Sequence, residues 1–386
     1  SAGLEAGSGS RALRRPRRSP SIHDGRVSRR IVAGVDCSTQ STKVLVVDVD
    51  TGEVVAVGRA PHTVTGSGGA SETDPTIWSA ALAEALGATG VAGEVAAISV
   101  AGQQHGLVVS DAGGRPLRPA VLWNDTRSAP DAAALVADLG ATWWATEVGS
   151  VPVASFTVTS WAWLRRTEPE VARAVASLCL PHDWLTGQLC GRVVTDRGDA
   201  SGTGWWSVPH ARYHPQVLDH PLVGVDPTWL PPVLGPADAA GTVTSSAASR
   251  LGLRPGIPVG PGTGDNMGAA LGLALEPGTA VLSLGTSGTA FAVTEQPAAD
   301  ATGVVAGFAD ATGRYLPLAC TLNATLAVDR FASWPGLDRE DIASSSGTAV
   351  VVPFLDGERT PDLPDATGSV LGLTHVTTRQ EVLRSA

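Results

Sequence analysis

The 386-residue sequence has few cysteines and a single lysine, and it contains no long apolar run. No pair among its four cysteines has Cys-x-x-Cys spacing, which argues against a zinc ribbon or a dithiol redox site. We therefore expect reduced thiols and a cytoplasmic protein. The sequence also lacks a stretch of 18 apolar residues, so we expect no membrane-spanning helix.

Positive charge is scarce overall, and the net charge of −10 argues against nucleic acid as a partner. Residues 1–30 are the exception, because eight arginines outweigh Glu5 and Asp24 and give about +6. This segment has no apolar region typical of a signal peptide and no aromatic side chains that could stack on bases. We predict that it is a disordered basic extension outside the fold.

Strand-like and helix-like patterns alternate after Arg30, and the length favours two domains with sizeable cores. The first half predicts strands at 31–35, 43–49, 54–57 and 95–100, with a helix from Pro75 to about Ala88. The second half predicts a hairpin at 280–284 and 289–293, then a helix at 322–331 and a strand at 350–354. We predict α/β domains at 31–256 and 257–386, with a polar turn from each half meeting at one cleft.

Asp265 is the strongest candidate for a catalytic group. It lies in Gly262-Thr263-Gly264-Asp265-Asn266, between a strand-like stretch at 257–261 and a helix predicted at 267–275. A carboxylate in a glycine-rich turn can accept a proton from a substrate hydroxyl, although it can equally cap the helix.

Two polar turns could hold phosphate groups through backbone N–H groups and hydroxyls, and Asp36 could also bind Mg²⁺. Both turns are equally compatible with ordinary hydrophilic hairpins. The candidate phosphate-binding residues are Ser38, Thr39, Gln40, Ser41 and Lys43 in the first turn, and Gly285, Thr286 and Ser287 in the second.

Several polar loops could bind a sugar. Gln104 and His105 follow a predicted strand, at the sheet edge where open α/β folds bind ligands. Trp123 and Asn124 could shape the same pocket. A polar loop at 195–203 fits a pocket wall or the protein surface equally well. Glu358-Arg359-Thr360-Pro361 indicates an ion-paired structural corner.

Taken together and in this order, the motifs resemble the FGGY carbohydrate kinases. That family has two actin/Hsp70/hexokinase-like (ribonuclease H-like) domains around a central cleft. The resemblance runs from about residue 31 to the end. It rests on Gly34–Ser41, Gly102–Gly106, Leu122–Asp125, Gly264–Asn266, Ser283–Gly288 and Gly357–Pro361.

The resemblance implies ATP-dependent phosphorylation of a ketose, D-xylulose to its 5-phosphate, with ATP and Mg²⁺ required and a homodimer compatible with it. Asp265 would be the catalytic base and Asp36 would serve the Mg²⁺ and phosphate end. Gln104, His105, Trp123, Asn124 and Asn266 would bind the sugar. The two polar turns would approach the ATP phosphates.

Two departures from the family pattern matter. The corresponding sugar loop usually has methionine at the position of Gln104, so this wall of the pocket is more polar. We also find no Gly-Gly-Gly-Ala-type adenosine loop after residue 300. The resemblance thus implies that the second domain is incomplete, and that this chain alone binds ATP poorly and turns over weakly or not at all.

Two other readings remain open at this point. A related kinase for glycerol, gluconate, ribulose or fuculose would share the fold and Asp265. A non-catalytic sugar-binding protein of the same fold would need sugar binding without nucleotide binding.

Overall fold

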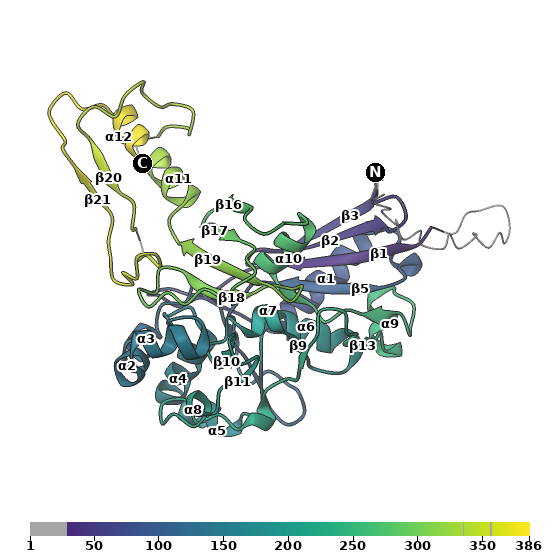
Figure 1. Cartoon of the computed structure of the whole chain (residues 1–386). Coiled ribbons are helices and arrows are strands. Elements are labelled where there is room, and N and C mark those ends of the chain that lie inside the picture. Colours follow the sequence, from purple (N-terminus) through teal and green to yellow (C-terminus); the bar gives the residue numbers. More distant parts are fainter. Residues whose placement is uncertain (1–28, 335, 356) are drawn as a thin grey trace, which may run out of the picture.

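The computed structural model describes residues 29–334, 336–355 and 357–386 (Figure 1). The predicted basic extension therefore lies, apart from Arg29 and Arg30, outside the described residues. No helix within the described part of the chain is long and apolar enough to cross a membrane.

A mixed sheet forms the first half, as predicted, with the order β13-β14-β5-β1-β2-β3. Strand β2 runs antiparallel to both β1 and β3, the latter at the sheet edge, while β5 runs parallel to β1 and pairs with β15. The strands are β1 (Ile31–Cys37), β2 (Ser41–Asp48), β3 (Val54–Pro61), β5 (Ile98–Gly102), β13 (Gly241–Thr242), β14 (Pro258–Val259) and β15 (Thr263–Gly264).

Alternation along β1 decides which side chains enter the core. Ile31 and Val35 are buried on one face, so Asp36 necessarily points to the other. Helix α1 (Pro75–Thr89) covers the buried face; Asp74 caps its start and Trp78 lies in the core. Helices α6 (Pro181–Cys190) and α9 (Ser245–Leu251) contribute to the same core, as does the short η1 helix (Ala92–Glu94) at its margin.

Helices and short strand pairs fill the middle of the chain, and they lie below both sheets in Figure 1. Trp161 and Trp163 are buried there and belong to its hydrophobic core. The helices are α2 (Ala129–Leu139), α3 (Ala141–Trp143), η2 (Trp144–Val148), α4 (Thr157–Thr167), α5 (Pro169–Ala174), α7 (Arg197–Ala200), α8 (Pro215–Leu218) and η3 (Pro227–Trp229). The paired strands are β4 (Glu72–Thr73) with β7 (Ala120–Val121), β6 (Val108–Ser110) with β8 (Ser177–Cys179), β9 (Thr195–Asp196) with β12 (Val233–Leu234), and β10 (Trp206–Ser207) with β11 (Arg212–Tyr213).

Helix α10 (Asp265–Gly272) follows the first sheet and leads into a second, antiparallel sheet of order β16-β17-β19-β18. Its strands are β16 (Ala280–Leu284), β17 (Gly288–Ala292), β18 (Ala306–Ala309) and β19 (Tyr315–Thr321). The pairing of β16 with β17 confirms the predicted hairpin. Phe291 and Phe308 join this sheet to the core of the helical middle region.

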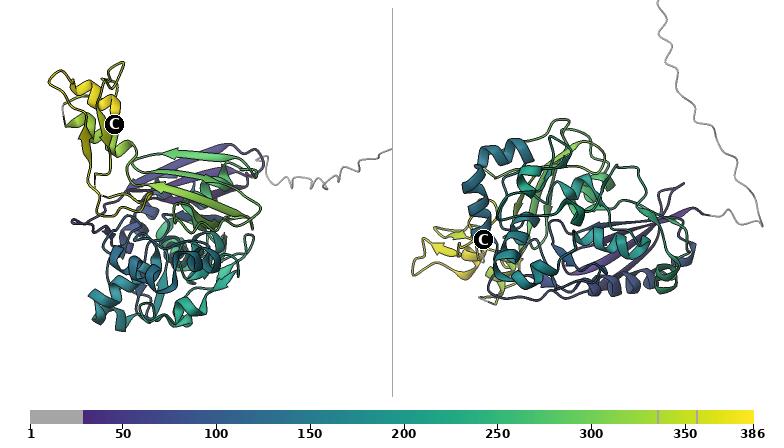
Figure 2. Two further views of the ribbon diagram at one scale, coloured as in Figure 1. Left: turned by 60° about the vertical axis from the view of Figure 1, so that its left-hand side comes forward. Right: turned by 90° about the horizontal axis from the view of Figure 1, so that it is seen from below.

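The last elements form a small unit that projects from the second sheet (Figures 1 and 2). It consists of α11 (Thr325–Ser333), β20 (Val350–Val352), β21 (Ser369–Leu371) and α12 (Arg379–Ser385). Phe331, Ala332 and Leu383 are its buried centre. The predicted helix at 322–331 begins three residues later, at Thr325.

Candidate active site

A cavity of about 210 Å³ lies where the β1–β2 turn, the loop after β5, the start of α10 and the β16–β17 turn meet. Both polar turns reach it, as the sequence predicted for turns from the two halves of the chain. Its lining residues are Ser38, Thr39, Gln104, His105, Trp123, Asp265, Asn266, Ser283, Gly285, Thr286, Ser287, Thr289, Leu318, Cys320 and Arg359.

Five predicted site residues do not line this cavity. Asp36 and Lys43 face each other across β1 and β2, and Lys43 Nζ lies 3.6 Å from Asp36 Oδ2. Ser41 is buried at the start of β2, and Gln40 is exposed at the turn. Asn124 lines a smaller neighbouring cavity, which shares Trp123 and Arg359 with the first. Their roles stay predictions.

Asp265 is the first residue of α10 and is partly buried at the cavity wall. Desolvation by the surrounding protein raises its pKa to about 7, and the negative charges of Asp199 and Asp36 act in the same direction. Hydrogen bonds from the backbone and side chain of Asn266 oppose this shift. A carboxyl group with a pKa near 7 suits a general base at neutral pH.

Asn266 connects three parts of the site. Its Nδ2 donates to Asp265 Oδ1 at 2.9 Å and to Gln104 Oε1 at 2.8 Å. Its Oδ1 accepts a hydrogen bond at 3.1 Å from Oγ1 of Thr289, which belongs to β17 in the second sheet. The sequence motif placed Asn266 beside Asp265 but gave no sign of the contact with Thr289.

His105 is buried and has a φ of +65°, a left-handed conformation that is uncommon for a residue other than glycine. Desolvation lowers its pKa to about 3, helped by the positive charge of Arg359, so the ring is neutral. Nδ1 lies 2.8 Å from the Gly202 carbonyl, which requires Nδ1 to be the donor. Nε2 is therefore a hydrogen-bond acceptor, which suits a sugar hydroxyl.

Polar atoms without partners lie at this cavity and at its smaller neighbour. Gln104 Nε2 and Asn124 Oδ1 are buried and lack hydrogen-bond partners among the described residues. Such groups are costly unless a ligand or water satisfies them. Trp123 is held in place by its Nε1, which donates to Thr39 Oγ1 at 3.1 Å.

Arg359 is the main residue that the sequence analysis misjudged. The predicted structural role of this corner is confirmed for Glu358, which accepts hydrogen bonds from Thr321, Asn323 and nearby backbone N–H groups. The predicted ion pair is not: the described residues show no pair between the Glu358 carboxylate and the Arg359 guanidinium. The Arg359 guanidinium lies over Phe156, with its carbon 5.9 Å from the ring centroid, and lines both cavities. Ser283 and Thr289 were also missed, since hydroxyl residues on strands carry no distinctive signal.

Asp36 has the chemistry of a Mg²⁺ ligand, because a partly exposed carboxylate is a hard oxygen donor. Ser38 Oγ donates to its Oδ1 at 2.8 Å, which fixes its orientation. Asp36 on β1 and Thr263 on β15 both pair with Ala101 of β5, so Asp36 lies at the same end of the sheet as Asp265. The residues present therefore fit a divalent ion coordinated at Asp36.

A second set of possible metal ligands, Glu147, His210 and His214, lies outside this cavity. His210 Nε2 is 3.0 Å from Glu147 Oε2, and His214 Nε2 is 3.7 Å from it. His214 Nδ1 is buried without a partner among the described residues. A metal on Nε2 would force a proton onto that unpartnered nitrogen, so we interpret the group as a hydrogen-bonded cluster in which neutral His214 donates from Nε2.

Comparison with known proteins agrees with this geometry. Residues 31–272 match the model of the FGGY family of carbohydrate kinases, N-terminal domain. The chain belongs to the FGGY family of carbohydrate kinases. Its α/β architecture is accordingly of the actin-like ATPase type.

Sequence relatives and solved structures of this family are similar over most of the chain. The xylulose kinases of Streptomyces rubiginosus and Streptomyces coelicolor are 57% and 58% identical, over 92% of this chain and 73% of each relative. The crystal structure of xylulose kinase from Bifidobacterium adolescentis is 39% identical with a TM-score of 0.77, covering 92% of this chain and 79% of that one. The chain thus spans about three quarters of the length of these relatives.

Proposed function

We propose that the protein phosphorylates D-xylulose at its 5-hydroxyl with ATP, giving D-xylulose 5-phosphate and ADP. The observation that carries this proposal is Asp265, a carboxylate with a pKa of about 7 at the wall of a polar cavity. The high identity to xylulose kinases supports the choice of sugar.

The cavity offers groups for each part of the reaction. Asp265 accepts the proton of the sugar's 5-hydroxyl. The oxygen of that hydroxyl forms a bond to the γ-phosphorus of ATP, while the bond between the γ-phosphorus and ADP breaks. His105 Nε2 accepts a hydrogen bond from a sugar hydroxyl, and Gln104 Nε2 donates one. Alignment of the hydroxyl with the phosphate accounts for much of the catalysis.

The phosphate end is assigned to the two turns. Thr39, Thr286 and Ser287 line the cavity, and their hydroxyls can donate to phosphate oxygens, whereas the Ser38 hydroxyl already donates its proton to Asp36. Asp36 would hold Mg²⁺, which supplies positive charge against the phosphates when bound. Asp36 is already oriented by Ser38, so this assignment needs no rearrangement of the turn.

The test is an ADP-release assay with D-xylulose, D-ribulose, L-fuculose, gluconate and glycerol, alongside calorimetric titration of D-xylulose and of ATP. Turnover by this chain alone is expected to be weak, as the sequence analysis predicts, so the sugars are compared by their ratios of kcat/KM. We expect D-xylulose to give the highest kcat/KM and D265N to bind the sugar without turnover. A higher kcat/KM for another sugar would overturn the proposed substrate. Sugar binding with neither ATP binding nor turnover would instead favour a non-catalytic sugar-binding chain.

A further inference from the structure

A small cavity adjoins the sugar end of the candidate active site. It has a volume of about 20 Å³ and shares Trp123 and Arg359 with the main cavity, which contains Asp265 and residues of both polar turns. A cavity needs about 10–15 Å³ to hold one water molecule. The small cavity therefore has room for one hydroxyl-sized group, next to the main cavity at Trp123 and Arg359.

Two polar groups of the small cavity have no partner within the described part of the chain. Asn124 and Ser155 line this cavity, and Asn124 Oδ1 and Ser155 Oγ are both buried without a hydrogen bond. Asp125 and Glu358 line it too, but their carboxylates already accept several hydrogen bonds each. Buried polar atoms without partners are costly, so the first two groups indicate a bound group. Asn124 Oδ1 can only accept, whereas Ser155 Oγ can also donate, so a hydroxyl satisfies both.

Ser155 belongs to a segment that packs directly against His105, a proposed sugar ligand. The ring of Phe156, the next residue, stacks on the His105 ring, with centroids 5.1 Å apart and planes inclined by 12°. Thr157 Oγ1, at the start of α4, donates to the His105 carbonyl at 2.9 Å. The segment that carries Ser155 is therefore fixed relative to the sugar side of the main cavity.

Hydrogen bonds to adjacent residues hold the two unpartnered groups in place. The carbonyl of the residue before Ser155 accepts from Ser128 Oγ at 2.6 Å. The carboxylate of the residue after Asn124 accepts from the Ser71 N–H at 2.9 Å. A ligand hydroxyl would thus meet groups that are already oriented, which lowers the entropic cost of binding.

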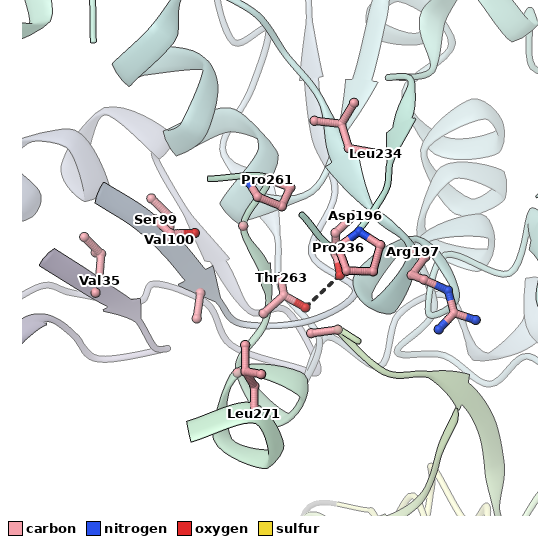
Figure 3. A pocket seen from close by; sticks show the side chains of 15 residues that line it. Val35, Ser99, Val100, Asp196, Arg197, Leu234, Pro236, Pro261, Thr263 and Leu271 are labelled. Atoms are coloured by element: carbon pink, nitrogen blue, oxygen red, sulfur yellow. Dashed lines mark hydrogen bonds between the residues drawn. The ribbon is translucent and has the colours of Figure 1, made fainter. Parts of the chain in front are cut away.

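The polar loop at 195–203 reaches a different cavity, of about 210 Å³, beside β1, β5 and β15 (Figure 3). Asp196 and Arg197 line it, so the pocket-wall alternative is correct for these two residues. Asp196 Oδ2 accepts from Thr263 Oγ1 at 2.8 Å, the dashed line in Figure 3, and Arg197 Nη1 donates to the Arg314 carbonyl at 2.6 Å. Because these groups have partners within the protein, a polar ligand is less strongly indicated here than in the small cavity. Ser99 lines this cavity and not the candidate active site.

We propose that the small cavity binds the 1-hydroxyl of D-xylulose, and that Ser155 and Asn124 make the site selective for it. The hydroxyl donates a hydrogen bond to Asn124 Oδ1 and accepts one from Ser155 Oγ. The 1-hydroxyl is at the end of the sugar opposite the 5-hydroxyl, and a terminal group enters a cavity of this size more easily than a hydroxyl within the carbon chain. This inference rests on the proposed function, because it assumes that the 5-hydroxyl lies at Asp265.

The experiment measures the Kd of two sugars by calorimetric titration in the absence of ATP. D-xylulose is compared with 1-deoxy-D-xylulose, which lacks only the 1-hydroxyl. The proteins are wild type, S155A, N124A and the matched control S99A, which removes a serine hydroxyl from the cavity in Figure 3. Because sugar binding is measured directly, weak turnover by this chain does not affect the comparison.

We expect wild type to bind D-xylulose more tightly than 1-deoxy-D-xylulose. S155A and N124A should each weaken D-xylulose binding by about 2–10-fold, the usual contribution of one neutral hydrogen bond, and leave the Kd of 1-deoxy-D-xylulose unchanged. S99A should keep both wild-type values. S155A should not lower the melting temperature, because its hydroxyl has no partner within the described residues.

The two proposals fail in different ways. If S155A and N124A weaken both sugars equally, or change neither, the small cavity does not bind the 1-hydroxyl and the inference is overturned. If wild type binds neither sugar, the inference and the proposed function are both overturned. If the selectivity is lost in S155A and N124A as expected, but the wild type neither binds ATP nor turns over, the inference stands and the proposed function is overturned.

Discussion

The side-chain amide of Asn266 donates to Asp265 Oδ1 at 2.9 Å and thereby fixes the carboxylate in the cavity. The same Nδ2 donates to Gln104 Oε1 at 2.8 Å. One amide group therefore orients both Asp265, the proposed base, and Gln104, a proposed sugar ligand. Asn266 Oδ1 accepts from Thr289 Oγ1 on β17, and this third contact makes the geometry depend on the second sheet. A change in the packing of the two sheets against each other should therefore alter the position of the Asp265 carboxylate.

The first prediction concerns Asp265 as a base. D265N should lower kcat by about 10²–10⁴-fold, the usual contribution of a general base, while D-xylulose affinity changes little. Because the pKa of Asp265 is about 7, kcat/KM of the wild type should fall below about pH 7 as the carboxylate is protonated. Steady-state assays from pH 5 to 9 and calorimetry test both statements.

The control for this experiment is D219N, which changes an exposed aspartate at the end of α8. It should retain wild-type activity and pH dependence. Near-normal turnover by D265N would rule out Asp265 as the base.

The second prediction concerns the stability cost of Asp265. Its pKa is raised in the folded state to about 7 from an ordinary value of 3.8, so the folded protein binds more protons between those values. Stability conferred by this group is therefore lost as pH rises from about 4 to about 7. D265N should be more stable than wild type at pH 8, by about 1–2 kcal/mol given partial exposure of the side chain, and equal to it near pH 3.5. Urea unfolding at the two pH values measures the difference, and a constant difference would contradict the assignment.

The sheet framework was predictable because its signals are local. Apolar runs such as Ile31–Val35 and the Asp74-Pro75 helix start are read directly from neighbouring residues. The same holds for Asp265, which stands in a glycine turn at a helix start. Because the second half of the sequence repeats the pattern of the first, the meeting of the two polar turns at one cleft could also be predicted.

Long-range polar contacts were not predictable in this way. Arg359 reaches the cavity because Glu358 is held by Thr321 and Asn323, 37 and 35 residues earlier in the chain. His182 on α6 and Asp199 on α7 lie 3.0 Å apart, and the polar loop at 195–203 gave no sign of this contact in the sequence. A sequence pattern records spacing along the chain, whereas these contacts depend on how separate elements pack.

The third prediction concerns His105 as a neutral sugar ligand. H105N keeps a residue that tolerates the φ of +65° but removes the acceptor at Nε2. It should raise the KM for D-xylulose about 10-fold or more and change kcat less. Because the pKa of His105 is about 3, the wild-type KM should not vary between pH 5 and 9 through this ring. H210A, which alters an exposed histidine outside the cavity, is the control; an inflection near pH 6.5 that disappears in H105N would show that His105 titrates instead.

The last prediction concerns Arg359, whose guanidinium lines both the main cavity and its neighbour. R359M keeps the side-chain length but removes the charge and all five donors. It should lower kcat/KM for D-xylulose by about 10–100-fold, with R359K recovering part of the loss because it restores the charge without the planar fork. R250M, at an exposed position on α9, should behave as wild type. If R359M is fully active and only less stable, the side chain serves to pack over Phe156, and the structural role that the sequence suggested for this corner is the correct one.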